Sequence, residues 1–245
     1  MKNLKWLAPF CFMLLFTFSC ENEDGHHGVF NCLKGEGNVI TQELLINEFK
    51  SVKLKSSSNV FITQGSPFKV IVKGQANIIS NIETDIQDDR WEIEFEDCMK
   101  DYTKLNIYIT MPDIQKLKVD GSGSIQGVNE FDVDEIELKV DGSGKMDVKL
   151  SDATKVIADI SGSGEIKLAG TANLIDIEIG GSGDVYAFDL ETNIANVKIN
   201  GTGDVEVFVN DDLTGKINGT GDIYYKGNPS VDVEIHGTGK VKNSN

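Results

Sequence analysis

The chain has 245 residues, with 39 acidic and 23 basic side chains and a formal net charge of −16 at pH 7. A protein this acidic is poorly suited to bind nucleic acid or an anionic lipid surface by charge, so we expect no nucleic-acid partner. The plain explanation of the acidity is the solubility of an exported protein. Only four prolines occur and no low-complexity linker interrupts the chain, which predicts one continuous domain.

Residues 1–19 have the features of an export signal. Lys2 and Lys5 precede an apolar run over 7–18 that is too short to span a bilayer comfortably. Ser19-Cys20 and an acidic, polar stretch follow, an order that resembles a bacterial lipoprotein signal and implies a lipidated Cys20. Thr17 and Phe18 depart from the residues that such signals prefer. Ordinary cleavage nearby, which would release a secreted protein, is the alternative.

Residues 20–34 are polar and lack alternation, so they are predicted to form a tether. Two cysteines remain once the leader and Cys20 are set aside: Cys32, which lies in this tether, and Cys98, which lies beyond it. An even pair in an oxidising compartment suggests a disulfide, and two independent buried thiols are the alternative. Two cysteines without a paired histidine do not make a zinc site, and we expect no metal and no cofactor.

The single domain is predicted to span residues 35–245, and its first part, 35–115, shows strand-like alternation with irregular corners. Apolar and polar residues alternate over 91–95 and 105–109, and 51–62 aligns with the later repeat, with serines at the corner. We therefore expect irregular coils of the same fold here, followed by regular coils over 116–245. At about 20 residues per coil, the whole domain would make about ten coils.

The regular part contains the tripeptide Gly-Ser-Gly or Gly-Thr-Gly seven times, at spacings of 21, 20, 19, 20, 18 and 18 residues. Alternating apolar residues lead into each tripeptide and resume after it, and a more variable corner completes the unit. Two glycines around a small hydroxyl residue permit positive φ and a tight turn. The predicted structural corners are Gly121 and Gly123, Gly142 and Gly144, Gly162 and Gly164, Gly181 and Gly183, Gly201 and Gly203, Gly219 and Gly221, and Gly237 and Gly239.

Two all-β architectures fit this unit of strand, glycine corner, strand and variable corner. One is a β-solenoid of about 20-residue coils stacked about 4.8 Å apart, and the other is an antiparallel meander. The solenoid is favoured, because near-identical corners are best explained by corners that pack on one another. The central hydroxyl residues, from Ser122 to Thr238, would then form one ladder.

Asp184, Asp204 and Asp222 directly follow three of the corners and suggest calcium-binding repeats. Calcium repeats of that kind have a nine-residue period with a different aspartate position. Lysines stand at two equivalent positions, Lys145 and Lys240, and lysine cannot contribute an oxygen ligand. The pattern therefore argues against calcium.

Four aromatic residues alternate away from the apolar positions after the later corners: Tyr186, Phe188, Phe208 and Tyr224. If the coils stack in register, these side chains would lie side by side on an outer face, where apolar patches often mark contacts. Alternatively, aromatics merely suit exposed strand positions. We treat the set as a candidate interaction patch.

Catalysis is not indicated. Polysaccharide lyases and hydrolases need a base near cationic groups or two facing carboxylates. Arg90 is the sole arginine, and His236, the one histidine outside the tether, stands at a position before a corner. We predict that the protein is not an enzyme.

Together with the serial corners, the segments 47–52, 59–65 and 108–112 resemble the "putative auto-transporter adhesin head GIN domain" family of Bacteroidetes. The resemblance implies a right-handed β-helix of pectin-lyase-like shape without conserved catalytic residues. It also implies cell adhesion, with a homo-oligomer and a host-surface or glycan ligand as expected partners.

We accordingly predict a non-catalytic outer-membrane lipoprotein at the cell surface, held to the membrane by its lipid anchor. A periplasm-facing or secreted protein is the alternative placement. The alternative functions are a polysaccharide-binding envelope module and, less favoured, a polysaccharide lyase or hydrolase.

Overall fold

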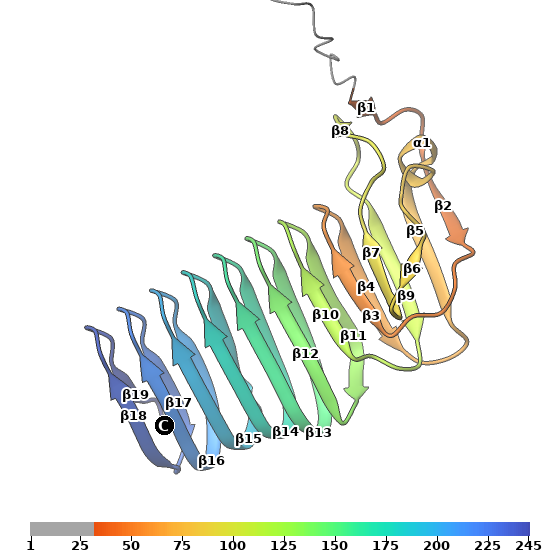
Figure 1. Ribbon diagram of the computed structural model, residues 1–245. Helices are drawn as coiled ribbons and strands as arrows, with labels where there is room; N and C mark the ends of the chain where they lie inside the picture. Colours follow the sequence, from red (N-terminus) through yellow and green to blue (C-terminus); the bar gives the residue numbers. More distant parts are fainter. Residues whose placement is uncertain (1–31) are drawn as a thin grey trace, which may run out of the picture. The chain divides into compact units, whose positions relative to one another are not determined.

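The computed structural model describes residues 32–245, which form an all-β solenoid of about six turns with one short helix (Figure 1). The predicted solenoid is thereby confirmed over the meander. The predicted signal over 1–19, the lipidation candidate Cys20 and the tether up to residue 31 lie outside the described residues.

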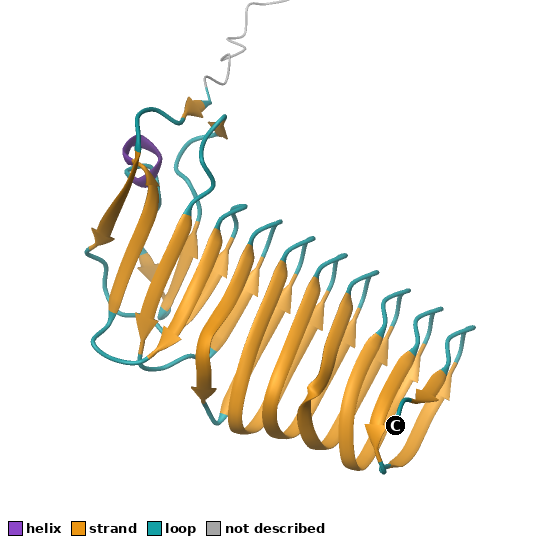
Figure 2. Ribbon diagram, turned by 180° about the vertical axis from the view of Figure 1, so that it is seen from behind, coloured by secondary structure: helices purple, strands orange, loops and turns teal. Residues whose placement is uncertain are grey.

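Two sheets make the walls of the solenoid. The pre-corner sheet contains the strands that lead into each glycine corner, and the post-corner sheet contains the strands that leave it. Four long strands pass from the post-corner sheet round the variable corner into the pre-corner sheet (Figure 2): β13 (Lys145–Ile160), β14 (Glu165–Ile179), β15 (Asp184–Ile199) and β16 (Val205–Ile217).

Shorter strands complete both sheets. The pre-corner sheet also contains β7 (Arg90–Ile93), β3 (Ser51–Leu54), β10 (Lys116–Val119), β12 (Glu135–Val140) and β18 (Ser230–Ile235). The post-corner sheet also contains β9 (Asn106–Met111), β4 (Asn59–Gln64), β11 (Ser124–Asp132), β17 (Ile223–Gly227) and β19 (Val241–Asn243). Neighbouring strands in these series pair in parallel.

Alternation decides which side chains enter the space between the sheets. In β12, Ile136, Leu138 and Val140 are buried while the residues between them are not. Parallel register then stacks equivalent residues from coil to coil. One such column is fully buried along the solenoid: Leu54, Val119, Val140, Ile160, Ile179, Ile199 and Ile217. Each buried aliphatic side chain stabilises the fold by about 1.5–3 kcal/mol before the entropy cost of ordering.

The first coils are not stacked in chain order. The coil of β3 and β4 lies between the coil of β10 and β11 on one side and that of β7 and β9 on the other. The chain therefore lays down one coil, extends past it to build another, and returns to continue the stack. Sequence alternation cannot reveal this order, because every coil carries the same inward-facing pattern.

Beyond β7 and β9 the structure changes to an antiparallel cap. β2 (Val39–Leu44) pairs with β5 (Lys69–Gln75), β5 pairs with β9, and β6 (Ile86–Gln87) pairs with β7, all antiparallel. The helix α1 (Ala76–Ile79) buries Ile78 and Ile79. Residues 35–115 thus supply two coils and a cap in place of coils throughout, so the solenoid has fewer than the expected ten coils.

Cys32 and Cys98, the pair singled out in the sequence, are joined by a disulfide across a separation of 66 residues. The bond stands beside a small separate sheet in which β1 (Leu33–Lys34) pairs in parallel with β8 (Met99–Lys100). The last residues of the expected tether are therefore part of the folded unit.

The glycine corners need glycine for a reason other than the one expected. None of the fourteen corner glycines has a positive φ; those conformations occur in the variable corners, at Gly170 and Gly227 among others. The corner glycines are instead close to the backbone of the preceding corner. The N–H of Ser163 donates to the Gly142 carbonyl at 2.9 Å, and that of Ser182 to the Gly162 carbonyl at 2.9 Å. The repeat therefore requires glycine because the stacked corners leave no room for a side chain, and not because these residues need a positive φ.

Candidate functional site

One outward-facing row of side chains runs the length of the post-corner sheet, and we call it the outer column. Strand register stacks its members in this order: Tyr108, Phe61, Gln126, Asp147, Lys167, Tyr186, Glu206, Tyr224 and Lys242. At about 4.8 Å per strand, the outer column extends for roughly 38 Å. Two of the predicted interaction residues, Tyr186 and Tyr224, lie on it.

The four predicted aromatic residues do not form a contiguous apolar patch. Tyr186 lies opposite Glu206, and Glu206 lies opposite Tyr224, so a carboxylate separates the two tyrosines. Phe188 and Phe208 lie beside the outer column, where breaks in the strand register displace Phe208 to a position opposite Glu191. The expectation that the rings lie side by side was wrong, because the coil between the two tyrosines places Glu206 at their position and a register break displaces Phe208.

Lysine side chains lie over two of these rings. Lys226 Nζ is 4.4 Å from the centroid of Phe188, and Lys242 Nζ is 4.6 Å from that of Tyr224. Such cation–π contacts stabilise exposed rings modestly and cover their faces. Tyr186 remains 36% exposed. The surface is therefore one of alternating rings and charges.

Phe61 and Tyr108 were missed in the sequence analysis. Their rings are stacked, with centroids 5.1 Å apart and planes inclined by 15°, and Tyr108 is 41% exposed. Alternation in both segments does show that each residue faces outward. What the sequence could not show is that the unusual coil order makes them neighbours and places them on the same column as Tyr186.

The electrostatics of the outer column centre on Glu206. Burial raises the pKa of its carboxyl group, and the nearby carboxylates Asp189, Asp184 and Asp204 add to this while Lys226 opposes it. Burial and the Asp184 carboxylate likewise raise the pKa of the Tyr186 hydroxyl. This part of the face therefore has a negative potential and favours a partner that brings positive charge or hydrogen-bond donors.

The aspartates that follow the corners have a structural role. Oδ1 of Asp184 accepts the N–H of Asp204 at 2.8 Å, and Oδ1 of Asp204 accepts that of Asp222 at 2.7 Å. In earlier coils a backbone carbonyl accepts the equivalent N–H, as for Glu165 N to Gly144 O at 3.0 Å. The carboxylates replace that carbonyl where the backbone register changes. No group of His, Cys, Asp or Glu within 32–245 is arranged to hold a metal ion.

The pre-corner sheet carries a ladder of ion pairs on its outer surface. Lys118 contacts Asp141, and Lys139 lies 2.9 Å from Asp159. Burial acts to raise the pKa of Asp141, but hydrogen bonds and charge from Lys118 and Lys139 outweigh it and lower that pKa overall. These charges are satisfied among themselves, so this part of the sheet presents little unpaired charge to a ligand.

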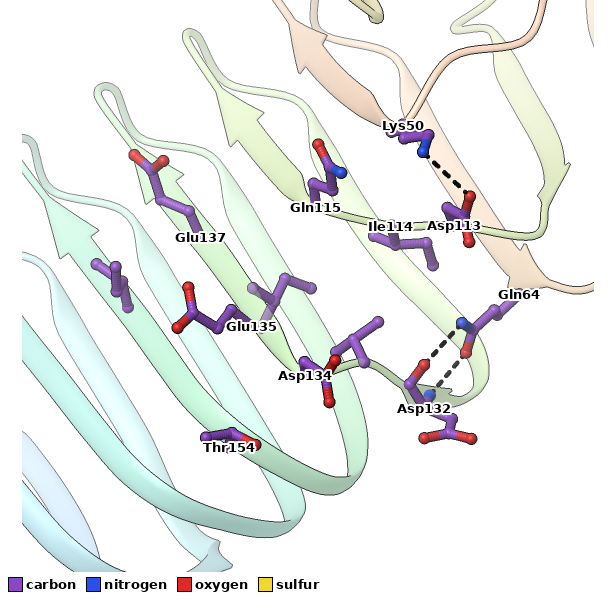
Figure 3. A pocket seen from close by; sticks show the side chains of 13 residues that line it. Lys50, Gln64, Asp113, Ile114, Gln115, Asp132, Asp134, Glu135, Glu137 and Thr154 are labelled. Carbon is purple, nitrogen blue, oxygen red and sulfur yellow. Dashed lines mark hydrogen bonds and ion pairs between the residues drawn. The ribbon is translucent and has the colours of Figure 1, made fainter.

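An open groove of about 910 Å³ lies near the variable-corner edge (Figure 3). Gln64 anchors it: its side chain donates to the Asp132 carbonyl at 3.0 Å and accepts the Asp132 N–H at 2.7 Å. Lys50 pairs with Asp113 at 3.4 Å, while Asp134 and Glu135 line the groove without a basic partner in the described chain. The groove is acidic and open, and it is lined by the link between β9 and β10 and by the link between β11 and β12.

The residues considered for catalysis lie apart. The Arg90 guanidinium lies 3.1 Å from Glu92 on the pre-corner sheet, and His236 Nε2 lies 3.3 Å from Glu234 in the last coil.

Within the described residues no helix is long and apolar enough to cross a membrane.

The family comparison matches residues 48–229 to "Putative auto-transporter adhesin, head GIN domain", and the chain belongs to this family. The match covers the two early coils, part of the cap and nearly all the regular corners. The resemblance seen in the sequence is therefore confirmed. A search among curated proteins found no match.

Solved structures share the fold. A "putative adhesin" from Bacteroides fragilis NCTC 9343 is 23% identical, with a TM-score of 0.79 over 86% of this chain and 100% of its own. A "putative adhesin" from Parabacteroides merdae ATCC 43184 is 26% identical, with a TM-score of 0.72 over 87% and 99%. A "putative lipid binding protein" from Parabacteroides distasonis ATCC 8503 is 22% identical, with a TM-score of 0.75 over 87% and 99%.

Proposed function

We propose that this protein is a non-catalytic, surface-displayed adhesin anchored in the outer membrane through a lipid on Cys20. The outer column is the observation that carries the proposal. It gives a rigid sheet an exposed surface of rings and charges roughly 38 Å long, which suits attachment to an extended partner. Membership of the head GIN family and the adhesin names of the structural relatives support the same role.

The rigidity of this surface matters for adhesion. Each side chain of the outer column stands on a strand that is paired on both sides, except Lys242 in the last coil. The inward-facing residues beneath it, such as Val185, Val205 and Ile223, are fully buried. A preorganised surface of this kind loses little conformational entropy when it binds a partner.

Attachment of intact cells tests the proposed role. We expect cells that display the protein to bind a host-cell or mucin-coated surface, and Tyr108→Ser with Tyr186→Ser to reduce binding several-fold. Both tyrosines are more than a third exposed, so the variant should fold normally. Ile157→Ser, on the outer surface of the opposite sheet, is the matched control. Equal attachment by the double variant and the parent would contradict the proposal.

Display and anchoring are tested separately. Protease added to intact cells should cleave the domain while a periplasmic marker survives, and Cys20→Ser should abolish incorporation of labelled fatty acid. Protection of the domain until lysis would place it inside the envelope and remove adhesion to external surfaces.

A polysaccharide-binding module is the second candidate, and the spacing of two rings favours it. Tyr186 and Tyr224 lie two strands apart on the outer column, roughly 10 Å, a distance over which separate sugar units of an extended chain could each stack on a ring. A glycan-binding screen with intact cells distinguishes the two: selective binding that Tyr186→Ser abolishes supports the module. Turnover of a bound acidic glycan would instead support a lyase or hydrolase.

A further inference from the structure

The last coil of the solenoid is open on its outer side. β18 pairs only with β16, and β19 pairs only with β17, among the pairings of residues 32–245. Both sheets therefore end in a strand with a row of unpaired backbone groups. Exposed edges of this kind readily pair with a strand of another chain.

The core is also uncovered at this end. Register places Val231 over Leu213 and Ile235 over Ile217. Leu213 and Ile217 are fully buried, whereas Val231 is 41% exposed and Ile235 is 46% exposed. These side chains face inward, and only one neighbouring coil covers them. The geometry thus provides an apolar centre bordered by two strand edges.

The opposite end of the solenoid differs. There the cap buries Trp91, Leu105 and Ile78 completely, and β2 is the outer strand on one sheet while the two-residue β6 is the outer strand on the other. The six-residue β18 and the three-residue β19 cannot both pair with such an end. Head-to-tail stacking of two copies would leave one of the two sheets without a partner strand.

Charge indicates what kind of partner fits the open end. On its outward positions β18 carries Asp232 and Glu234, while β19 carries Lys242 and is preceded by Lys240. One edge is therefore acidic and the other basic. Within the chain Lys242 contacts Asp222, and Glu234 lies 3.5 Å from Lys216. A second copy, turned so that its basic edge meets the acidic edge, adds a partner of opposite charge to both edges at once.

We propose that two copies associate through their last coils as a closed two-fold dimer, with β18 of each antiparallel to β19 of the other. A two-fold axis parallel to the strands keeps the glycine corners of both copies along one side. Residues equally far from the corner then face each other across the interface. Glu234 faces Lys242 of the second copy, and Ile235 faces Val241 of the second copy.

The small area of this interface predicts a weak association. A strand of six residues is roughly 20 Å long and the sheets lie about 10 Å apart, so each copy contributes a few hundred square ångströms. Interfaces of that area are transient in dilute solution. Dimers are then favoured where copies are concentrated, as on a membrane surface. The proposal does not depend on what the outer column binds.

Light scattering of the full chain, purified in detergent and corrected for bound detergent, tests the proposal over a range of concentrations. We expect the mass to rise from one copy to two and no further. Ile235→Asp should weaken association at least tenfold, because it places carboxylates within the apolar centre. Thr214→Asp, an exposed change on the same sheet one coil away, is the matched control and should associate like the parent.

A cysteine trap keeps the test independent of the folding of Ile235→Asp. Ile235→Cys combined with Val241→Cys should give a covalent dimer on mild oxidation, and either change alone should not. A mass of one copy at every concentration, masses that grow beyond two copies, or a dimer from Ile235→Cys alone would each overturn the proposal. A thermal midpoint equal to that of the parent shows that a variant is folded.

Discussion

Gly181 stands directly above the Gly162 carbonyl, and no side-chain carbon fits between them. A Cβ on Gly181 would lie under 3.0 Å from the Gly162 oxygen, closer than Cβ atoms lie in real proteins. Gly201 and Gly219 stand over the carbonyls of the preceding corners in the same way. The corners thus stack as closely as strands do, and the Ser182 N–H reaches the Gly162 carbonyl at 2.9 Å.

Gly181→Ala should therefore lower the free energy of unfolding by about 2–4 kcal/mol, because backbone and not a flexible side chain must move. Gly180→Ala is the matched control. A Cβ on Gly180 would have no neighbour closer than 3.8 Å, and Gly180 has no positive φ. Urea unfolding of both variants checks this. Equal midpoints for the two would contradict the close-packing account.

The fold could be predicted from the sequence because coil length and alternation are local properties. Ile136, Leu138 and Val140 alternate as a half-buried strand must, and the tripeptides recur at nearly constant spacing. The cap and the order of the early coils could not be predicted. They depend on pairings such as Phe61 with Tyr108, 47 residues apart, that no local pattern specifies.

The disulfide between Cys32 and Cys98 should stabilise the domain by about 2–4 kcal/mol, since it closes a long loop in the unfolded chain. Cys32→Ser with Cys98→Ser should lower the urea midpoint accordingly, and reductant should lower the midpoint of the parent by a similar amount. Reductant should have no effect on the double variant, which serves as its own control. A parent midpoint that does not respond to full reduction would rule out this contribution.

The Asp184 carboxylate should be needed as a hydrogen-bond acceptor and not as a charge. Asp184→Ala leaves the part-buried Asp204 N–H without its 2.8 Å partner, which should cost about 1 kcal/mol. Asp184→Asn keeps an oxygen at that position and should cost less than half as much. Chemical unfolding distinguishes them. Equal losses in the two variants would show that charge is what matters, and added calcium should stabilise neither.

The candidate surface was less predictable than the fold, and the reason is register. Outward positions can be identified from alternation, so Tyr186 and Tyr224 were found correctly as outward-facing residues. Glu206, in the coil between them, stands at the same distance after its glycine corner as each tyrosine does, and it therefore separates the two rings in the stacked coils. The placement of the phenylalanines depends on more than alternation, because a break in the register after Ala187 places Phe208 opposite Glu191.

Glu206 should destabilise the domain at neutral pH. Its carboxyl has a raised pKa in the folded state, chiefly through burial, so the folded protein holds this proton more tightly than the unfolded chain does. The penalty is thus present when the carboxyl is ionised and disappears as the pH falls through the folded and then the unfolded pKa, near 4.3. Glu206→Gln should raise the thermal midpoint by about 1–2 °C at pH 7.

The same substitution should have little effect near pH 4, where the parent carboxyl is already largely protonated in the folded state. Glu191→Gln is a suitable control, because this exposed carboxylate lies on the neighbouring strand β15, outside the outer column. It accepts a hydrogen bond from Asn210 at 2.9 Å, which the oxygen of a glutamine amide can also accept. Thermal unfolding at both pH values gives the comparison. A Glu206→Gln variant that is less stable than the parent at pH 7 would mean that the ionised carboxylate stabilises the column, with Lys226 as its effective partner.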